Sequence, residues 1–250
     1  IGSSIVSPVI EHPMVKAVTL TGSEAAGRKV AGRAGKALKK TVLELGGSDP
    51  FMVLSDADLA NCAAVAAQAR TINSGQSCIA AKRFIVVDSV ADDFLPLFQK
   101  SMEALVVGDP LDPNIQVGPQ AREDLMQKLH SQVQISLAKG ARLVTGGKPM
   151  DRPGYFYPPT ILADVKPGMP AFDEEIFGPV AAVVRVKDEN EAVDMANRTS
   201  FGLGASLWTR DKERGEALAR RIEAGAVFVN GMVASDPRLP FGGIKASGYG

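Results

Sequence analysis

Short runs of apolar residues alternate with longer amphipathic segments from one end of the chain to the other. Residues 15–21, 83–87 and 180–186 have the length and the β-branched content of buried strands. Residues 24–38 and 121–139 instead repeat apolar positions with the spacing of a helix. Because this alternation is typical of a parallel sheet with helices on its faces, the sequence predicts an α/β fold with a mostly parallel sheet wrapped by helices.

The same pattern predicts the remaining elements. Further strands are expected at residues 42–45, 51–54, 142–145, 205–208 and 226–229, and an extended region at 155–162. Further helices are expected to end near residues 72 and 105 and to cover 189–197 and 212–222. The proline- and glycine-containing segment 107–120 is expected to be an ordered loop.

Two helix boundaries depend on single residues. Ser55, with Asp58 three residues later, resembles a capping box at the start of the helix that ends near Ile72. Pro96 lacks a backbone donor, so it should perturb the helix that follows residues 83–87 unless that helix starts late.

The balance of positive and negative charges limits the kinds of molecule that the protein is expected to bind. The chain has 28 basic and 28 acidic residues and no run of Lys or Arg, which argues against nucleic-acid and membrane-surface partners. No apolar stretch approaches the roughly 20 residues that span a bilayer, and the first residues lack the pattern of a secretion signal. We therefore expect a cytoplasmic protein.

The cysteines and histidines do not suggest a disulfide framework or a metal site. Two cysteines in 250 residues suit a reducing compartment. His12 is interpreted as a solvated loop residue and His130 as part of a helix face, because they have no ligand spacing. No metal is expected.

Cys78 ends the small, polar stretch 73–78. Turn N–H groups or a following helix N-terminus there could lower the pKa of the thiol and make it a nucleophile. Taken alone, a buried inert thiol is the more common role of such a cysteine. Cys62 lies among alanines on a predicted helix face and is interpreted as a packing residue.

Glu44 ends an apolar strand just before Gly46 and Gly47. A carboxylate that faces little water has a raised pKa and can act as a proton acceptor. The alternative is a solvated glutamate on an edge strand. The glycine pair permits close approach of a ligand or of another segment to the backbone.

Three further motifs could contact a ligand. Gly22 and Ser23 join a strand to a helix whose N-terminus could face a phosphate. In segment 174–179, Glu175 could accept hydrogen bonds from ribose hydroxyls and Phe177 could pack against a planar group. Residues 240–243 form a tight turn after a strand. Each motif alone is explained equally well as a turn.

Together, in their order and spacing, these motifs resemble those of the aldehyde dehydrogenase superfamily. The resemblance runs from the strand before residues 21–23 to residues 245–248, and segments 45–51 and 80–84 look most like bacterial succinate-semialdehyde dehydrogenases. It implies an enzyme that oxidises an aldehyde to a carboxylate with NAD or NADP. It also implies a homo-oligomer, a dimer or a tetramer.

The resemblance gives two residues a catalytic role. Cys78 would attack the aldehyde, with its own backbone N–H as one oxyanion donor. After hydride loss to the nicotinamide, Glu44 would activate the water that hydrolyses the thioester on Cys78.

The resemblance gives other residues a role in cofactor binding. Gly22 and Ser23 would lie near the diphosphate, and the backbone of Leu45 beside the nicotinamide carboxamide. Glu175 would bind the nicotinamide ribose, and Phe177 would lie against the ring.

The chain departs from the superfamily in extent. Members begin with most of a dinucleotide-binding domain that does not occur in this sequence. Residues 1–46 are expected to be the end of that domain, 47–246 the catalytic domain and 247–250 the start of a returning tail. The chain therefore resembles the C-terminal half of a member.

A second departure concerns the substrate. Ile72 stands where several succinate-semialdehyde dehydrogenases have an arginine that holds the distal carboxylate of the substrate. Either another residue takes over this role, such as Ser235 or Arg238 in the loop 234–239, or the preferred aldehyde is less acidic.

Two other functions stay open. In a CoA-acylating aldehyde dehydrogenase, CoA attacks the thioester instead of water, and Glu44 counts against this because that branch generally lacks the glutamate. A catalytically silent structural or interaction protein could also retain the fold, because a fold alone does not determine function.

Overall fold

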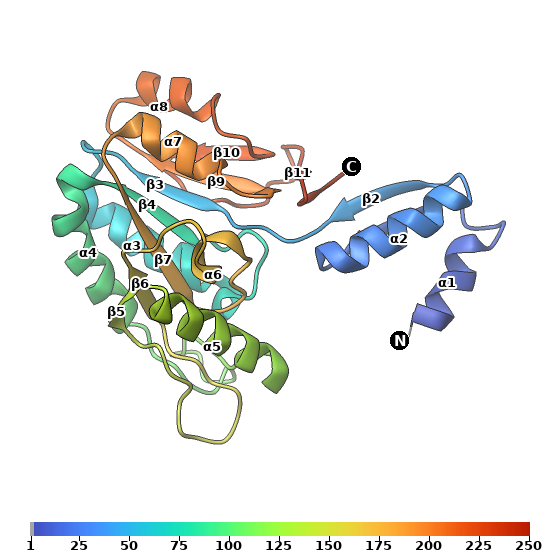
Figure 1. Cartoon of the computed structure of the whole chain (residues 1–250), viewed down its shortest axis with the longest axis horizontal. Coiled ribbons are helices and arrows are strands. Elements are labelled where there is room, and N and C mark those ends of the chain that lie inside the picture. The colour runs from blue at the N-terminus through green and yellow to red at the C-terminus, as the bar shows by residue number, and fades with distance from the viewer. Residues whose placement is uncertain (1–2) are drawn as a thin grey trace.

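The computed structural model describes residues 3–250 as two sheets with helices packed on them (Figure 1). The strands are β1 (Ala17–Thr21), β2 (Lys40–Glu44), β3 (Pro50–Val53), β4 (Arg83–Val87), β5 (Arg142–Thr145), β6 (Thr160–Ala163), β7 (Val180–Val186), β9 (Gly204–Trp208), β10 (Ala226–Val229) and β12 (Gly248–Tyr249), with the short pair β8 (Phe201–Gly202) and β11 (Ile244–Lys245). The helices are α1 (Ser3–Glu11), α2 (Glu24–Lys36), α3 (Leu59–Thr71), the 3₁₀ turn η1 (Ile72–Gly75), α4 (Asp88–Glu103), α5 (Glu123–Ala138), α6 (Pro170–Asp173), α7 (Glu189–Asn197) and α8 (Lys212–Ala219).

The larger sheet confirms the predicted α/β architecture. Its seven strands have the order β10-β9-β3-β4-β7-β6-β5, and all neighbours are parallel except β5, which runs antiparallel to β6. Alternate side chains of the central strands enter two separate cores. Phe51 and Phe84 point to the face that α3 and α4 cover, whereas Met52 and Ile85 point to the face that α5, α7 and α8 cover.

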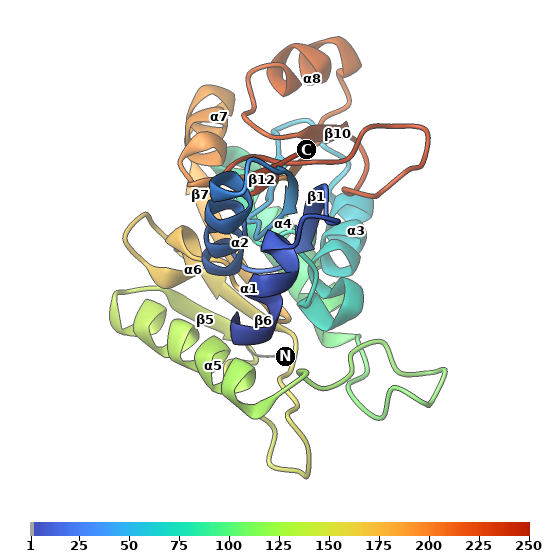
Figure 2. The same ribbon diagram turned by 90° about the vertical axis from the view of Figure 1, so that its right-hand side faces the viewer.

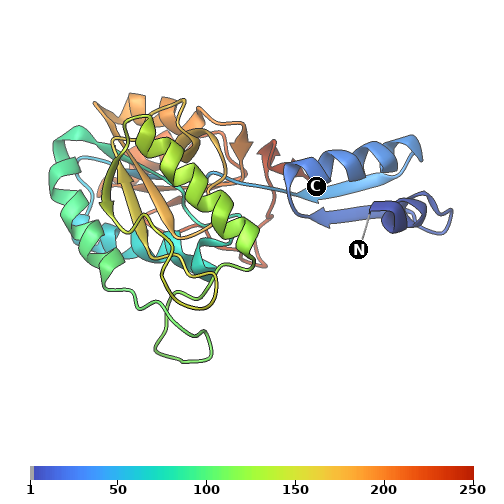
Figure 3. The same cartoon turned by 60° about the horizontal axis from the view of Figure 1, so that its bottom comes forward.

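A smaller sheet stands beside the larger one. Parallel β1 and β2 carry α2 on one side, and β12 returns from the end of the chain to pair antiparallel with β2 (Figure 3). Helices α1 and α2 contact each other in the part that faces the viewer in Figure 2. The segment after β2 therefore passes directly from one sheet to the other.

The two boundary predictions need correction. The predicted capping box at Ser55 is wrong, because Asp58 itself caps α3 by accepting a hydrogen bond from the Asn61 N–H at 3.3 Å, while Ser55 is exposed. Pro96 neither delays nor breaks α4, which starts at Asp88 and runs through it. Pro96 lies on the exposed side, where water can satisfy the freed carbonyl, and the buried Phe94 and Phe98 hold the helix on the sheet.

Candidate active site

Cys78 follows a sharp turn that connects α3 to β4. Asn73, Ser74 and Gly75 all have left-handed backbone conformations, with φ of 50°, 56° and 75°. The Ser74 hydroxyl accepts a hydrogen bond from the Gly118 N–H at 2.9 Å, and the buried Arg70 donates to the Gly75 carbonyl at 2.9 Å. This unusual backbone ends the helix and leaves Cys78 half-buried.

Gly75 should be the least replaceable residue of this turn. A Cβ added there would collide with the backbone of Gly178, and its φ would be strained for any other residue. Gly75→Ala in the full-length protein should therefore cost roughly 3–5 kcal/mol of unfolding free energy, the sum of strain and overpacking. Gly140→Ala is the matched control, because Gly140 has a φ of 101° with open space around it, so strain alone should cost about 1 kcal/mol. Unfolding free energy is measured by denaturant unfolding. Equal losses of unfolding free energy in the two variants would contradict this account of the turn.

A cleft of about 510 Å³ lies beside Cys78, between the smaller sheet and α5. Its wall brings together most of the predicted site residues: Gly22, Ser23, Leu45, Cys78, Glu175 and Phe177. The polar part of the wall also includes Thr21, Gln76, Ser77, Lys128 and Gln132. Residues that are more than a hundred positions apart in the chain thus face one space, which is large enough for a substantial ligand.

The middle of the cleft is built around a carboxylate and a glycine pair. Glu175 accepts a hydrogen bond from the Gly47 N–H at 3.0 Å. A Cβ on Gly46 would come within 2.6 Å of the same carboxylate, and one on Gly47 within 2.6 Å of the Cys78 carbonyl. The absence of side chains at both glycines therefore lets the strand-end segment pack against Glu175 and against the Cys78 turn.

The lining of the cleft combines two kinds of chemistry. Ser23 caps α2 by accepting from the Ala26 N–H at 3.3 Å, so the positive end of a helix dipole faces the cleft. The partly exposed ring of Phe177, together with Leu45 and Leu129, adds apolar surface to the same cleft. A group that carries both a phosphate and a flat ring matches this lining, so the residues present fit a nicotinamide dinucleotide.

Glu44 lies next to this cleft and does not line it. It ends β2, paired with Thr21 and Gly248, and the next two residues, Leu45 and Gly46, form part of the cleft wall. Its Oε2 atom is buried and has no hydrogen-bond partner, and burial raises the pKa of its carboxyl group. The side chain therefore has the free acceptor and the proton affinity that a general base requires.

The two cysteines differ in exposure. Cys62 is fully buried in α3, and burial raises the pKa of its thiol far above the ordinary value. Burial also raises the pKa of Cys78, while the positive charge of Lys82 and the Ile79 N–H act in the opposite direction. The turn therefore supplies one N–H group that lowers the pKa of the Cys78 thiol, as the sequence predicts. The effect of burial is larger, so the pKa is raised.

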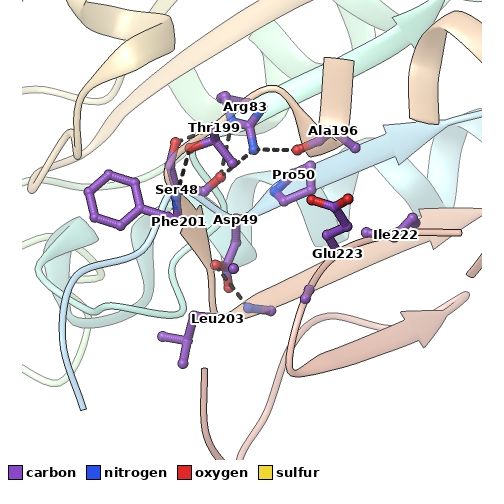
Figure 4. Close-up of a pocket in the computed structure, with 13 residues that line it drawn as sticks. Ser48, Asp49, Pro50, Arg83, Ala196, Thr199, Phe201, Leu203, Ile222 and Glu223 are labelled. Carbon is purple, nitrogen blue, oxygen red and sulfur yellow. Dashed lines mark hydrogen bonds between the residues drawn. The ribbon is translucent and has the colours of Figure 1, made fainter. Parts of the chain in front are cut away.

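Behind the Cys78 turn lies a group of buried charges that the sequence analysis did not identify. Asp49, Arg70, Lys82 and Arg83 are all excluded from solvent. Asp49 and Arg83 line one pocket (Figure 4), where Asp49 accepts from the Gly204 N–H at 3.1 Å and Arg83 donates to carbonyls that include Ser48 and Ala196. Charged residues at the end of a strand are usually solvated, so the order of residues in the sequence does not predict that these charges are buried.

The predicted substrate residues lie away from the cleft wall. Ser235 is exposed, and the side chain of Arg238 is 86% exposed and bonds Asp236 at 2.6 Å. Ile72 lines a second hollow of about 480 Å³ with Asn73 and Met232, and no Lys or Arg lines it. The role of Ser235 and Arg238 remains a prediction.

Metal and membrane features are absent from the part of the chain that the structure describes. Within residues 3–250, no three His, Cys, Asp or Glu side chains come together as a metal site. His12 is exposed, and His130 contacts the Tyr157 hydroxyl at 3.1 Å. No helix of these residues has both the length and the apolar character needed to cross a membrane.

Comparison with known proteins identifies the family. The sequence model of the aldehyde dehydrogenase family matches residues 1–250, so the chain belongs to that family. A succinate-semialdehyde dehydrogenase [NADP(+)] of Mycobacterium avium (strain 104) is 52% identical over 248 residues, which are 99% of this chain and 52% of the relative. The chain thus spans about half the length of the curated relatives it matches.

Solved structures agree with this assignment. The crystal structure of succinic semialdehyde dehydrogenase from Streptococcus pyogenes in complex with NADP+ superposes with a TM-score of 0.97 at 43% identity, covering 100% of this chain and 55% of that one. Lactaldehyde dehydrogenase from Escherichia coli gives a TM-score of 0.94 at 33% identity, covering 98% and 51%.

Proposed function

We propose that this chain carries the catalytic cysteine of an NADP+-dependent aldehyde dehydrogenase, with succinate semialdehyde as its substrate. The observation that carries the proposal is the single cleft in which Cys78 meets Ser23, Leu45, Glu175 and Phe177. The succinate-semialdehyde dehydrogenases among its relatives support NADP+ as the cofactor and this aldehyde as the substrate.

Under this proposal, each part of the cleft has a binding task. The N-terminus of α2 at Gly22 and Ser23 would face the diphosphate. Glu175, held by the Gly47 N–H, would accept hydrogen bonds from ribose hydroxyls, and Phe177 would pack against the nicotinamide ring. NADP+, when bound there, would supply the oxidising power by accepting a hydride, one proton with two electrons, from the substrate carbon.

The protein's own residues would carry the covalent steps. The Sγ atom of Cys78 gives up its proton and bonds to the aldehyde carbon, and the carbonyl double bond opens to leave a negative charge on the oxygen. Loss of a hydride from that carbon restores the carbonyl and leaves a thioester. Glu44 then takes a proton from a water molecule, whose oxygen attacks the thioester carbon. The carbon–sulfur bond breaks, which releases the carboxylate and restores the Cys78 thiol.

The division of the chain follows from the same proposal. Residues 1–46 would complete a cofactor-binding domain and residues 47–246 would form the catalytic domain. In support, β1 and β2 lie in the smaller sheet, which β12 of the returning tail joins, and β3 belongs to the larger one.

The test is turnover of the full-length protein with succinate semialdehyde and with butanal, a neutral aldehyde of the same chain length. We expect reduced cofactor with NADP+, and a kcat/KM for the acid aldehyde about tenfold higher or more, because a charge-assisted hydrogen bond contributes roughly 1.5–3 kcal/mol. Equal kcat/KM values would point to a less acidic substrate. Turnover that requires CoA would favour the acylating reaction, and no turnover with any aldehyde would favour a silent protein.

A further inference from the structure

Lys82 is a buried lysine placed directly behind the Cys78 turn. It precedes β4, its side chain is fully excluded from solvent, and its Nζ donates to the carbonyls of Ser77, Cys78 and Ala80 at 3.3, 3.1 and 2.9 Å. An ammonium group has three hydrogens, so all of them are used. A neutral amine has one fewer, so this arrangement belongs to the charged form.

Other buried charges surround Lys82. Asp49, Glu175 and Cys78 favour its charged form, whereas burial and Arg70 oppose it, so that its pKa lies below the ordinary value. The backbone N–H of Lys82 donates to the backbone carbonyl of Asp49 at 2.9 Å. Among the described residues, no ion pair joins the side chains of Lys82 and Asp49. The Asp49 carboxylate keeps one buried oxygen without a partner. Within the described part of the chain, the side-chain hydrogen bonds of Lys82 thus all go to carbonyls of the turn.

We propose that Lys82 is a positioning residue, whose ammonium group fixes the backbone of the Cys78 turn and holds a positive charge behind the thiolate that forms on Cys78. The inference rests on the proposed role of Cys78. Three carbonyls that bend around one cation fix the turn from Ser77 to Ala80. Among the groups that act on the Cys78 thiol, the charge of Lys82 is the largest influence that favours the thiolate, against Asp49 and Glu175.

A simpler role would be to neutralise Asp49. Under that alternative, loss of Lys82 would destabilise the protein through the uncompensated carboxylate, and the Cys78 thiol would change only as a consequence. Removal of both charges separates the two roles. Lys82→Met keeps the length of the side chain without its charge, and Asp49→Asn keeps the shape of its carboxyl group.

The experiment compares Asp49→Asn with Asp49→Asn/Lys82→Met in the full-length protein. The rate of Cys78 alkylation by iodoacetamide is followed from pH 6 to 10 (a range placed about the ordinary thiol pKa), with mass spectrometry to separate Cys78 from the buried Cys62. The double variant should react about tenfold more slowly at neutral pH, which corresponds to a rise of about one pKa unit. The difference should narrow as pH rises, and any residual gap at high pH measures displacement of the turn.

Lys187→Met is the matched control, because Lys187 is exposed after β7 and should leave the alkylation profile unchanged. Coincident profiles for Asp49→Asn and the double variant would overturn the inference. A failure of the proposed function would look different: aldehyde oxidation would survive Cys78→Ala, whatever the alkylation profiles of the lysine variants.

Discussion

Cys78→Ala should lower aldehyde oxidation by the full-length protein about 10⁴-fold or more, since loss of a covalent nucleophile removes the whole acylation route. The half-exposed thiol lines the cleft where the substrate carbon and the cofactor would meet. The measurement is the rate of NADPH formation at saturating succinate semialdehyde. Binding of NADP+, followed by protein fluorescence, should be retained, because alanine leaves the diphosphate and ribose contacts in place.

Cys62→Ala is the matched control for that variant. Cys62 is buried in α3 against the face of the larger sheet that carries Phe51 and Phe84. Its loss should cost about 1 kcal/mol of stability through a small cavity and leave turnover near the unsubstituted rate. If Cys62→Ala were the inactive variant and Cys78→Ala the active one, the assignment of the nucleophile would be wrong.

The alternation of apolar runs was sufficient to predict most of the larger sheet. β4, β5, β7, β10 and α7 begin and end at the predicted residues. β4 and β7 are buried between their neighbours, so local pattern and tertiary packing agree in these central strands. The sequence also predicted α2, α5 and α8, with ends that differ by up to three residues, since helix ends depend on capping contacts.

Elements whose existence depends on distant partners were not predictable in this way. β12 has only Gly248 and Tyr249, and it is a strand because it pairs with β2, about 200 residues earlier. β8 and β11 form a pair of the same kind. A run of two residues carries no periodicity, so nothing in the local sequence distinguishes such a strand from a turn.

The candidate site shows the same division between local and distant information. Each motif around Ser23, Glu175 and Cys78 was visible in the sequence, but each alone was explained equally well as a turn or as packing. The cleft unites them through contacts such as the Gly47 N–H to Glu175, across 128 positions of the chain. Only the resemblance to a family anticipated that union, and Lys82 escaped notice because its burial depends on three carbonyls that the turn brings together.

Glu44→Gln should slow steady turnover of the full-length protein by about a hundred- to ten-thousand-fold, the usual contribution of a general base. Glutamine keeps the shape of the side chain but cannot take a proton from water. Since cofactor reduction comes before hydrolysis of the thioester, the first turnover should remain fast. Stopped-flow absorbance should therefore show a burst of NADPH, near one equivalent per active site, followed by a slow phase. Glu103→Gln, at an exposed position of α4, is the control and should show no such burst.

The pH dependence separates two roles for Glu44. Burial raises the pKa of its carboxyl group, so the basic form appears at higher pH than for an ordinary glutamate. Steady turnover should then rise with pH through that raised pKa, and Glu44→Gln should lack this rise because it has no group to titrate. If Glu44 instead served to deprotonate Cys78, the burst itself would be slow in the variant and would recover as the thiol ionises at high pH. If Glu44→Gln instead kept the full steady rate and the burst of the unsubstituted protein, Glu44 would have no part in the reaction. The buried Oε2 atom without a hydrogen-bond partner would then need another explanation.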